Sequence, residues 1–201
     1  MDSLGGGFCF QGSGGEVRVL IRSQSLALST QHVVLGMAIT VLAGCGAGGD
    51  GSLRSISPDQ VKLVRGDSNA LEELVTAHKG EVVLVDYWAT WCGPCVENFP
   101  HTVELATKFR QQGLATIAVN FDLLEDEPKV REFLAKAGAD FENLISQHDS
   151  IGQKTWEDFE IGPLPEYRLY DRQGKLSQKW EGIAPGEVLT KKIEELLTEK
   201  P

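Results

Sequence analysis

The chain has 201 residues, of which 41% are hydrophobic and 24% are charged, and both fractions are ordinary for a soluble globular domain. Its formal net charge of −10 argues against a nucleic-acid-binding protein, because such a protein needs a basic surface to contact phosphates. The length allows one or two domains, so the domain boundaries have to be found in the patterns along the chain.

An apolar run near the N-terminus indicates a secretion signal. Residues 33–43 carry no charge and are too few to span a bilayer as a helix, which takes about 20 residues. They have the length of the hydrophobic part of a signal peptide, and Arg18 and Arg22 supply positive charge upstream. The run ends in Leu-Ala-Gly-Cys at residues 42–45, which resembles the lipobox of bacterial lipoproteins.

This resemblance implies that residues 1–44 are removed and that Cys45 is lipidated as the first residue of the mature chain. A buried helix and an ordinary cleavable signal are the alternatives. Because the N-terminal residues are rich in glycine and include acidic side chains, we expect the true start of translation to lie downstream. Residues 45–57 are rich in glycine and serine and predict a flexible tether, which leaves residues 58–201 for the globular domain.

The first half of this domain alternates helical and strand patterns. Residues 69–80 have apolar side chains on one helical face and end in glycine, which predicts a short amphipathic helix. A continuous apolar run at residues 81–89 predicts a strand that is buried on both faces. We expect the next helix to begin at the cysteines, to be kinked at Pro100 and to end at Gly113. Residues 114–122 then predict a second buried strand.

The second half of the domain shows three further helical patterns and a hairpin. Residues 125–140 and 150–161 predict helices, and residues 141–146 between them predict a short strand. Two alternating runs around a turn predict a hairpin at residues 166–182, and residues 186–200 predict a terminal amphipathic helix. This order predicts an α/β fold, with a central mixed sheet and helices on both faces.

Residues 88–95, which read Trp-Ala-Thr-Trp-Cys-Gly-Pro-Cys, carry the strongest chemical signal in the chain. Cys92 and Cys95 can be half of a metal site, a structural disulfide or a redox couple. Structural zinc needs four ligands at short spacings, and the four histidines are scattered, so we expect no metal site. A structural bridge across so small a loop would add little stability, so the pattern favours a redox couple.

The redox interpretation has a physical mechanism. At a helix N-terminus, unpaired N–H groups and the positive end of the helix dipole stabilise a thiolate. We therefore expect Cys92 to attack a substrate disulfide and Cys95, one turn later, to resolve the mixed disulfide. Gly93 allows close backbone packing, and Pro94 in the first turn sacrifices no hydrogen bond. Trp91 offers an apolar contact surface beside the sulfurs.

The stretch from Val85 to Cys95 resembles the active site of thioredoxin. Together with the lipobox, it makes residues 57–201 similar to the membrane-anchored thioredoxin-like reductases of bacteria, the TlpA/ResA-like group. The resemblance implies a thioredoxin fold, thiol–disulfide oxidoreductase activity and a βα insert at residues 120–161 that shapes the substrate groove. Trp88 lies in the same stretch, either as contact surface or, equally, as a core residue.

The resemblance also implies a cis-proline opposite the cysteines. The family's run of glycine, apolar residue, proline and strand matches residues 162–170, which places the cis-proline at Pro165. Pro163 is the competing assignment, but the strand begins directly after Pro165. In the family the backbone at this point pairs with the substrate chain, so Leu164 is expected to help hold the substrate.

Asp86 lies six residues before Cys92, inside the first buried strand, and thioredoxin carries an acid at the matching place. A buried carboxyl group has a raised pKa and can exchange a proton with Cys95 as a general acid or base. The alternative is a hydrogen-bonded core aspartate, because an unpartnered carboxyl would be costly there.

One position departs from the family pattern. The cytochrome c maturation relatives commonly carry a glutamate three residues after the second cysteine, where this chain has Asn98. Glu97, one residue earlier, is predicted to point elsewhere and to be a solvated charge. The resemblance therefore does not extend narrow specificity for apocytochrome c to this chain.

These features together predict an enzyme of the bacterial cell envelope that reduces protein disulfides and is held outside a membrane by the lipid on Cys45. Because the chain has no nucleotide-binding fingerprint, we expect no cofactor and a membrane partner that donates the electrons. The alternative is a binding or chaperone-like lipoprotein with the same fold and minor redox turnover. A peroxidase of this fold is excluded, because the setting of its lone reactive cysteine does not occur at Cys92 or Cys95.

Overall fold

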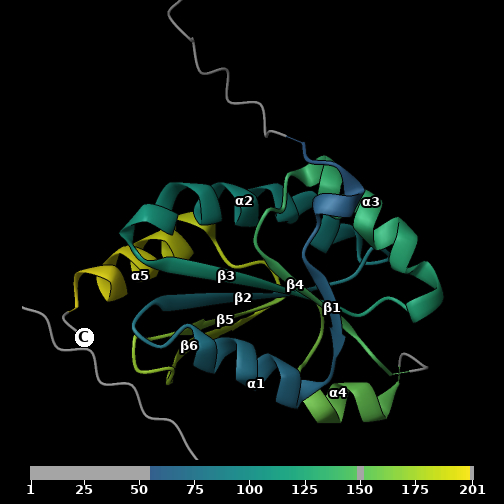
Figure 1. Ribbon diagram of the computed structural model, residues 1–201. Helices are drawn as coiled ribbons and strands as arrows, with labels where there is room; N and C mark the ends of the chain where they lie inside the picture. Colours follow the sequence, from purple (N-terminus) through teal and green to yellow (C-terminus); the bar gives the residue numbers. More distant parts are fainter. Residues whose placement is uncertain (1–54, 149–151, 200–201) are drawn as a thin grey trace, which may run out of the picture. The chain divides into compact units, whose positions relative to one another are not determined.

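The computed structural model describes residues 55–148 and 152–199 of the chain (Figure 1). The predicted signal, the lipidation residue Cys45 and almost all of the predicted tether lie outside the described residues. Within the part described, no helix is both long enough and apolar enough to cross a bilayer.

Six strands form one mixed sheet in the order β1-β4-β3-β2-β5-β6. Strands β1, β4, β3 and β2 run parallel to one another, whereas β5 is antiparallel to both β2 and β6. Every residue of β2 and β3 is buried, as expected for central strands that are covered on both faces. The strands are β1 (Leu63–Gly66), β2 (Val82–Trp88), β3 (Leu114–Asn120), β4 (Glu142–Ser146), β5 (Glu166–Tyr170) and β6 (Leu176–Glu181).

Helices cover both faces of the sheet. In Figure 1, α2 and α5 lie over one face, and α1 and α4 lie over the other. Leu84 of β2 shares one hydrophobic cluster with Leu189 of α5, and Val83 shares the other cluster with Leu71 of α1. The α-helices are α1 (Ser68–Ala77), α2 (Gly93–Phe109), α3 (Glu127–Ala137), α4 (Gln153–Phe159) and α5 (Gly186–Thr198), and the short 3-10 turns are η1 (Pro58–Gln60), η2 (Arg110–Gln112) and η3 (Leu124–Asp126).

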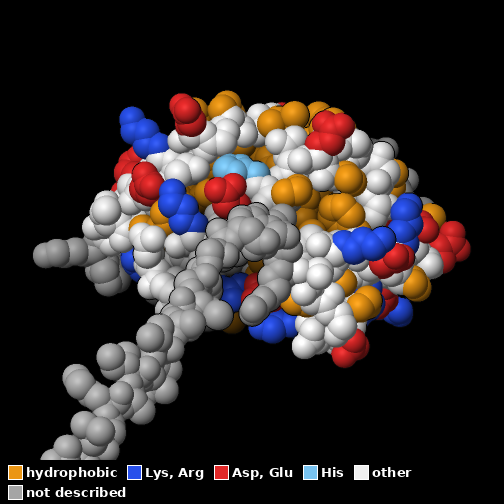
Figure 2. All heavy atoms as spheres, turned by 90° about the horizontal axis from the view of Figure 1, so that it is seen from above, with side chains coloured by type: hydrophobic (Ala, Val, Ile, Leu, Met, Phe, Trp, Pro, Cys, Tyr) orange, Lys and Arg blue, Asp and Glu red, His pale blue; other side chains and the backbone are white. Residues whose placement is uncertain are grey.

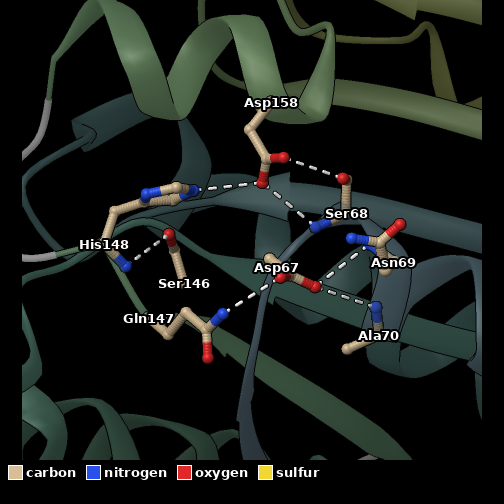
Figure 3. A network of polar contacts seen from close by, with 8 residues as sticks. All are labelled: Asp67, Ser68, Asn69, Ala70, Ser146, Gln147, His148 and Asp158. Atoms are coloured by element: carbon tan, nitrogen blue, oxygen red, sulfur yellow. Dashed lines mark hydrogen bonds and ion pairs between the residues drawn. The ribbon is translucent and has the colours of Figure 1, made fainter.

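A polar network ties the start of α1 to α4 and to the segment after β4 (Figure 3). Asp67 caps α1 by accepting two backbone hydrogen bonds, and Gln147 Nε2 donates to the same carboxylate over 3.0 Å. Asp158 of α4 accepts a hydrogen bond of 2.9 Å from the Ser68 hydroxyl and lies 3.0 Å from His148 Nε2. Two carboxylates therefore hold three segments that are distant in the sequence.

The predicted fold class is confirmed, and the predicted elements are present in the expected order. Helix α2 begins directly after Cys92, continues through Pro100, and is followed by a 3-10 turn that ends at Gly113, whose φ of 96° suits glycine. The predicted short strand at residues 141–146 is β4. Strand β1 was not predicted, because it has only four residues and lies at the sheet edge, where its two middle residues are exposed.

The contact between β1 and α1 generates a stability prediction at Gly66. A Cβ atom added there would lie 2.6 Å from the Ala70 Cβ and 3.1 Å from the Leu144 Cδ1. We expect Gly66→Ala to lower the free energy of unfolding in urea by roughly 1–3 kcal/mol, because the strand and the helix must move apart. The control is Gly152→Ala, where a Cβ atom meets no atom of the described residues within 4 Å. Equal effects of the two substitutions would contradict this account of the packing.

Candidate active site

Cys92 and Cys95 lie where the central strand β2 passes into α2. After Trp88 the chain makes a short loop, and Cys92 becomes the residue that caps the N-terminus of α2. The Cys92 Sγ accepts a hydrogen bond of 3.3 Å from the Cys95 backbone N–H. The two sulfurs are joined in a disulfide. The predicted placement of the pair at a helix N-terminus is therefore confirmed.

The surroundings of the two sulfurs differ. Cys92 is 7% exposed and Cys95 is 2% exposed, so an approaching thiolate meets Cys92 first. Cys95 is on the inner face of α2, which it shares with Phe99, four residues later. Gly93 and Pro94, both exposed, form the first turn between the sulfurs. This asymmetry matches an accessible sulfur for exchange and a buried sulfur for resolution.

The two tryptophans near the cysteines have different positions. Trp88 is fully buried, and its ring lies 4.6 Å from the Phe99 ring and 4.8 Å from the Phe133 ring, measured between centroids. Of the two interpretations of Trp88, core packing is therefore correct. Trp91 is 50% exposed beside the active-site disulfide, so its ring is available for contact with another molecule.

The peptide bond between Leu164 and Pro165 is cis, as the sequence predicts, and the competing assignment to Pro163 is wrong. The carbonyl group of Pro165 accepts a hydrogen bond of 2.7 Å from the Gly182 backbone N–H at the end of β6. Strand β5 begins at the next residue and pairs with β2, the strand that leads into the cysteines. The antiparallel pairing of β5 with β2 thus brings two segments that are distant in the sequence to one end of the sheet.

A largely apolar groove lies at this end of the sheet. It is lined by two aromatic rings and by the segment before the cis-proline, namely by Trp91, Trp156, Ile161, Gly162, Pro163 and Leu164. Trp156 comes from α4 in the predicted insert, and its ring packs on Phe121 with 5.5 Å between centroids. Its place in the groove was not predicted from the sequence.

On the face of the molecule that carries α2 and α5, hydrophobic side chains gather between acidic and basic ones (Figure 2). Large exposed hydrophobic side chains near the start of α5 include Ile183 and Val188, which are 54% and 50% exposed. Such surface is available to a polypeptide partner.

Asp86 is buried in β2 beneath α2. Its Oδ2 accepts a hydrogen bond of 2.6 Å from the Thr102 hydroxyl, and its Oδ1 has no hydrogen-bond partner among the described residues. Burial raises the pKa of Asp86 to about 7, and the hydrogen bond from Thr102 opposes this only in part. The structure thus contains both features that the sequence left as alternatives, a hydrogen-bonded core aspartate and a carboxyl group that titrates near neutral pH.

Glu166, the residue after the cis-proline, is fully buried and was not singled out from the sequence. Its carboxylate accepts a hydrogen bond of 2.7 Å from Arg168 Nε and lies 3.2 Å from Lys179 Nζ. It also accepts a hydrogen bond of 3.0 Å from the backbone N–H of Gly162, which lines the groove. Glu166 therefore holds the groove segment against the hairpin of β5 and β6.

Asn98, the position at which the chain departs from the cytochrome c maturation relatives, donates a hydrogen bond of 2.8 Å from its side chain to the carbonyl group of Pro94. It therefore stabilises the first turn of α2.

In the described ranges, no three histidine, cysteine or acidic side chains are arranged to bind a metal ion. His78 lies 2.6 Å from carboxylate oxygens of both Glu81 and Glu142.

The family model described as Redoxin matches residues 58–196. The thiol-disulfide oxidoreductase ResA of Geobacillus thermodenitrificans is 30% identical over 144 residues, which cover 71% of this chain and 76% of that protein. ResA of Bacillus anthracis is 34% identical over 101 residues, or 50% of this chain and 55% of that protein.

Among solved structures, a thiol:disulfide interchange protein described as DsbE from Chlorobium tepidum is 30% identical, with a TM-score of 0.53 over 61% of this chain and 84% of that chain. A thiol-disulfide isomerase from Corynebacterium glutamicum has a TM-score of 0.55 over 62% of this chain and 86% of that chain. At 20% identity, this second likeness concerns the fold alone.

The raised pKa of Asp86 predicts a pH-dependent stability. In the unfolded chain this carboxyl group loses its proton near its ordinary pKa of 3.8, and in the folded chain near 7. The folded state thus holds the extra proton between these values, and stability falls as the pH rises through this window. One pKa unit corresponds to about 1.4 kcal/mol, so the loss amounts to roughly 4 kcal/mol at most.

We therefore expect Asp86→Asn to raise the free energy of unfolding of the oxidised protein at pH 8 much more than at pH 4.5, measured by urea denaturation. Asparagine cannot ionise, so it removes the cost of burying a charge at the higher pH. The same substitution at the exposed Asp59 serves as the control. An equal effect of Asp86→Asn at both pH values would show that Asp86 does not titrate in this window.

Proposed function

The chain belongs to the redoxin family and is a thiol–disulfide oxidoreductase, and on this premise we propose that it reduces disulfides of extracytoplasmic proteins through Cys92 and Cys95. The observation that supports this most directly is the placement of Cys92 at the N-terminus of α2, beside the groove and the cis-proline. The less buried sulfur, the more buried second sulfur and a largely apolar groove lie at this end of the sheet, and together they support exchange with a polypeptide substrate.

Reduction proceeds by two successive thiol–disulfide exchange reactions. The Cys92 thiolate attacks one sulfur of the substrate disulfide, a mixed disulfide forms, and the other substrate sulfur leaves as a thiolate that takes up a proton. Cys95 then loses its proton and attacks the Cys92 sulfur, which releases the second substrate thiolate and leaves the disulfide of the present structure. Two electrons pass from the cysteine pair to the substrate disulfide.

Asp86 is suited to accept the proton of Cys95. Its pKa of about 7 leaves a fraction of the carboxyl groups ionised at neutral pH, as a general base requires. Thr102 holds one carboxylate oxygen from α2, the helix that also carries Cys95, and the other oxygen is free of partners among the described residues. We assign to this free oxygen the transfer of the proton, directly or through one water molecule.

The groove is suited to hold the substrate chain beside the cysteines. Leu164, directly before the cis-proline, offers its backbone for pairing with an extended segment. Trp91 and Trp156 offer aromatic rings to an apolar side chain of that segment. Because Asn98 stands where the cytochrome c maturation relatives commonly have glutamate, we assign the enzyme to protein disulfides in general rather than to apocytochrome c alone.

The cellular setting is part of the proposal. The apolar run at residues 33–43 and the lipobox that ends at Cys45 support export and a lipid anchor on the outer side of a membrane. After each turnover the disulfide has to be reduced again. The chain carries no nucleotide-binding fingerprint, which supports a membrane partner as the electron donor.

Substitution of each cysteine tests the proposed roles. We expect Cys92→Ser to abolish the reduction of insulin disulfides, because the attacking sulfur is lost. We expect Cys95→Ser to accumulate a mixed disulfide with the substrate, visible as an adduct on non-reducing gels, because the resolving sulfur is lost. A Cys92→Ser variant that folds and retains the reducing activity would show that Cys92 is not the nucleophile. If the wild-type protein binds insulin without reducing it, the chain is a binding module.

Export and lipidation are tested at Cys45. We expect the wild-type chain, expressed in a bacterium, to incorporate labelled palmitate and to sediment with membranes. Cys45→Ser removes the sulfur to which the lipobox resemblance assigns the lipid, so the label should disappear and the protein should no longer sediment with membranes. A wild-type chain that takes up no label would contradict the lipoprotein assignment and leave the redox function standing.

A further inference from the structure

Asp122 is a buried carboxylate that the mechanism above does not use. It lies two residues beyond the end of β3 and is 2% exposed. Its Oδ2 accepts hydrogen bonds of 2.7 Å from the Thr90 backbone N–H and of 2.7 Å from Asn120 Nδ2. Its Oδ1 accepts a hydrogen bond of 2.5 Å from the Thr90 hydroxyl. Two of its three donors thus belong to one residue.

Thr90 lies in the loop that leads to the nucleophile. Only Trp91 separates it from Cys92. On the other side of Thr90, the carbonyl group of Trp88 accepts a hydrogen bond of 3.0 Å from the Phe121 backbone N–H. The Cys92 backbone N–H itself donates to the Ala89 carbonyl group over 3.2 Å. The hydrogen bonds from Thr90 to Asp122 therefore fix the middle of the loop at residues 89–91. Backbone hydrogen bonds at Trp88 and Cys92 hold its two ends.

Asn120 holds Asp122 in place. Besides donating to its carboxylate, Asn120 accepts a hydrogen bond of 3.0 Å from the Asp122 backbone N–H through Oδ1. Both side chains are buried, and burying an ionised carboxylate costs several kcal/mol unless its oxygens are hydrogen-bonded. An apolar side chain at this position would leave the Thr90 N–H, the Thr90 hydroxyl and the Asn120 amide without this acceptor, so the carboxylate is what holds Thr90 in place.

We propose that Asp122 is a positioning residue for thiol–disulfide exchange, which acts through Thr90 to fix the loop at residues 89–91 and thereby the sulfur of Cys92. The hydrogen bond from the Cys95 N–H to the Cys92 Sγ depends on the backbone of Cys92, which holds φ −88° and ψ 97° as the N-cap of α2. A loop that moves at Thr90 moves this N-cap, and the N–H group then stabilises the thiolate less. The same loop carries Trp91 to the groove.

The inference rests on Cys92 as the nucleophile, and it is tested at Thr90, which leaves Asp122 and its hydrogen bonds with Asn120 in place. Thr90→Val removes the hydroxyl donor and keeps the shape, and Thr90→Ser keeps the donor. The readout is the rate of Cys92 alkylation by iodoacetamide between pH 5 and 10. It is followed by mass spectrometry of the peptide that contains Cys92, in full-length reduced proteins that also carry Cys95→Ser. Thr116→Val is the matched control, because the Thr116 hydroxyl, on β3, is also buried but has no partner among the described residues.

We expect Thr90→Val to slow alkylation at pH 6 by about tenfold and to raise the apparent pKa of Cys92, because thiolate is the reacting form. We expect Thr90→Ser and Thr116→Val to stay within twofold of the parent protein. A Thr90→Val protein that melts at a lower temperature but keeps the parent alkylation profile would overturn the proposal, since Asp122 would then serve stability alone. Thr90→Ala replaces Thr90→Val if valine prevents folding. A parent protein without pH-dependent alkylation of Cys92 would instead refute the nucleophile assignment itself.

Discussion

The hydrogen bond from the Cys95 backbone N–H to the Cys92 sulfur is the interaction on which the rest of the site depends. It exists because α2 starts directly after Cys92, where the first backbone N–H groups have no partner within the helix. Cys92 follows four residues after the end of β2, a central strand of seven buried residues. The Cys92 sulfur is thus positioned by a fully buried central strand and by the short hydrogen-bonded loop that joins this strand to α2.

The substrate side of the site is built around β5, the strand that runs antiparallel to β2. Strand β5 runs antiparallel to β2, so its first residue and the cis-proline before it lie at the same end of the sheet as the cysteines. Glu166 then fastens the groove segment to the hairpin, and α4 adds Trp156 to the groove wall. The residues proposed to bind the substrate and the cysteines proposed to react with it therefore lie on different segments. The pairing of β5 with β2 holds these segments next to each other.

Much of this arrangement could be predicted, because several elements are recognisable from the sequence pattern of a few neighbouring residues. The continuous apolar runs of β2 and β3 and the Gly-Pro turn between the cysteines each specify their own structure, whereas the cis-proline before β5 was predicted from the family resemblance. The edge strand β1 is different, because it pairs only with β4, and two of its four residues face solvent. Its pattern has no apolar alternation long enough to recognise.

The contacts between distant residues could not be predicted either. Nothing near Asp86 shows that Thr102 of α2 would bind it, and nothing near Trp156 shows that its ring would reach the groove. Buried charges such as Glu166 run against the usual exposure of acidic residues, and they become understandable only with the partners that the hairpin supplies. The motif at residues 88–95 therefore indicated the chemistry of the site, whereas the pKa of Asp86 and the shape of the groove depend on tertiary contacts.

The central claim is that the two sulfurs form a dithiol that gives electrons to substrate disulfides. The reduction potential of the pair, measured by equilibration with defined ratios of reduced and oxidised dithiothreitol, tests this most directly. We predict a value close to that of thioredoxin, about −270 mV, because the pair shares its Gly-Pro turn and its helix position. A value near that of the strong oxidant DsbA, about −120 mV, would contradict the account, since such a pair would take electrons from its substrates.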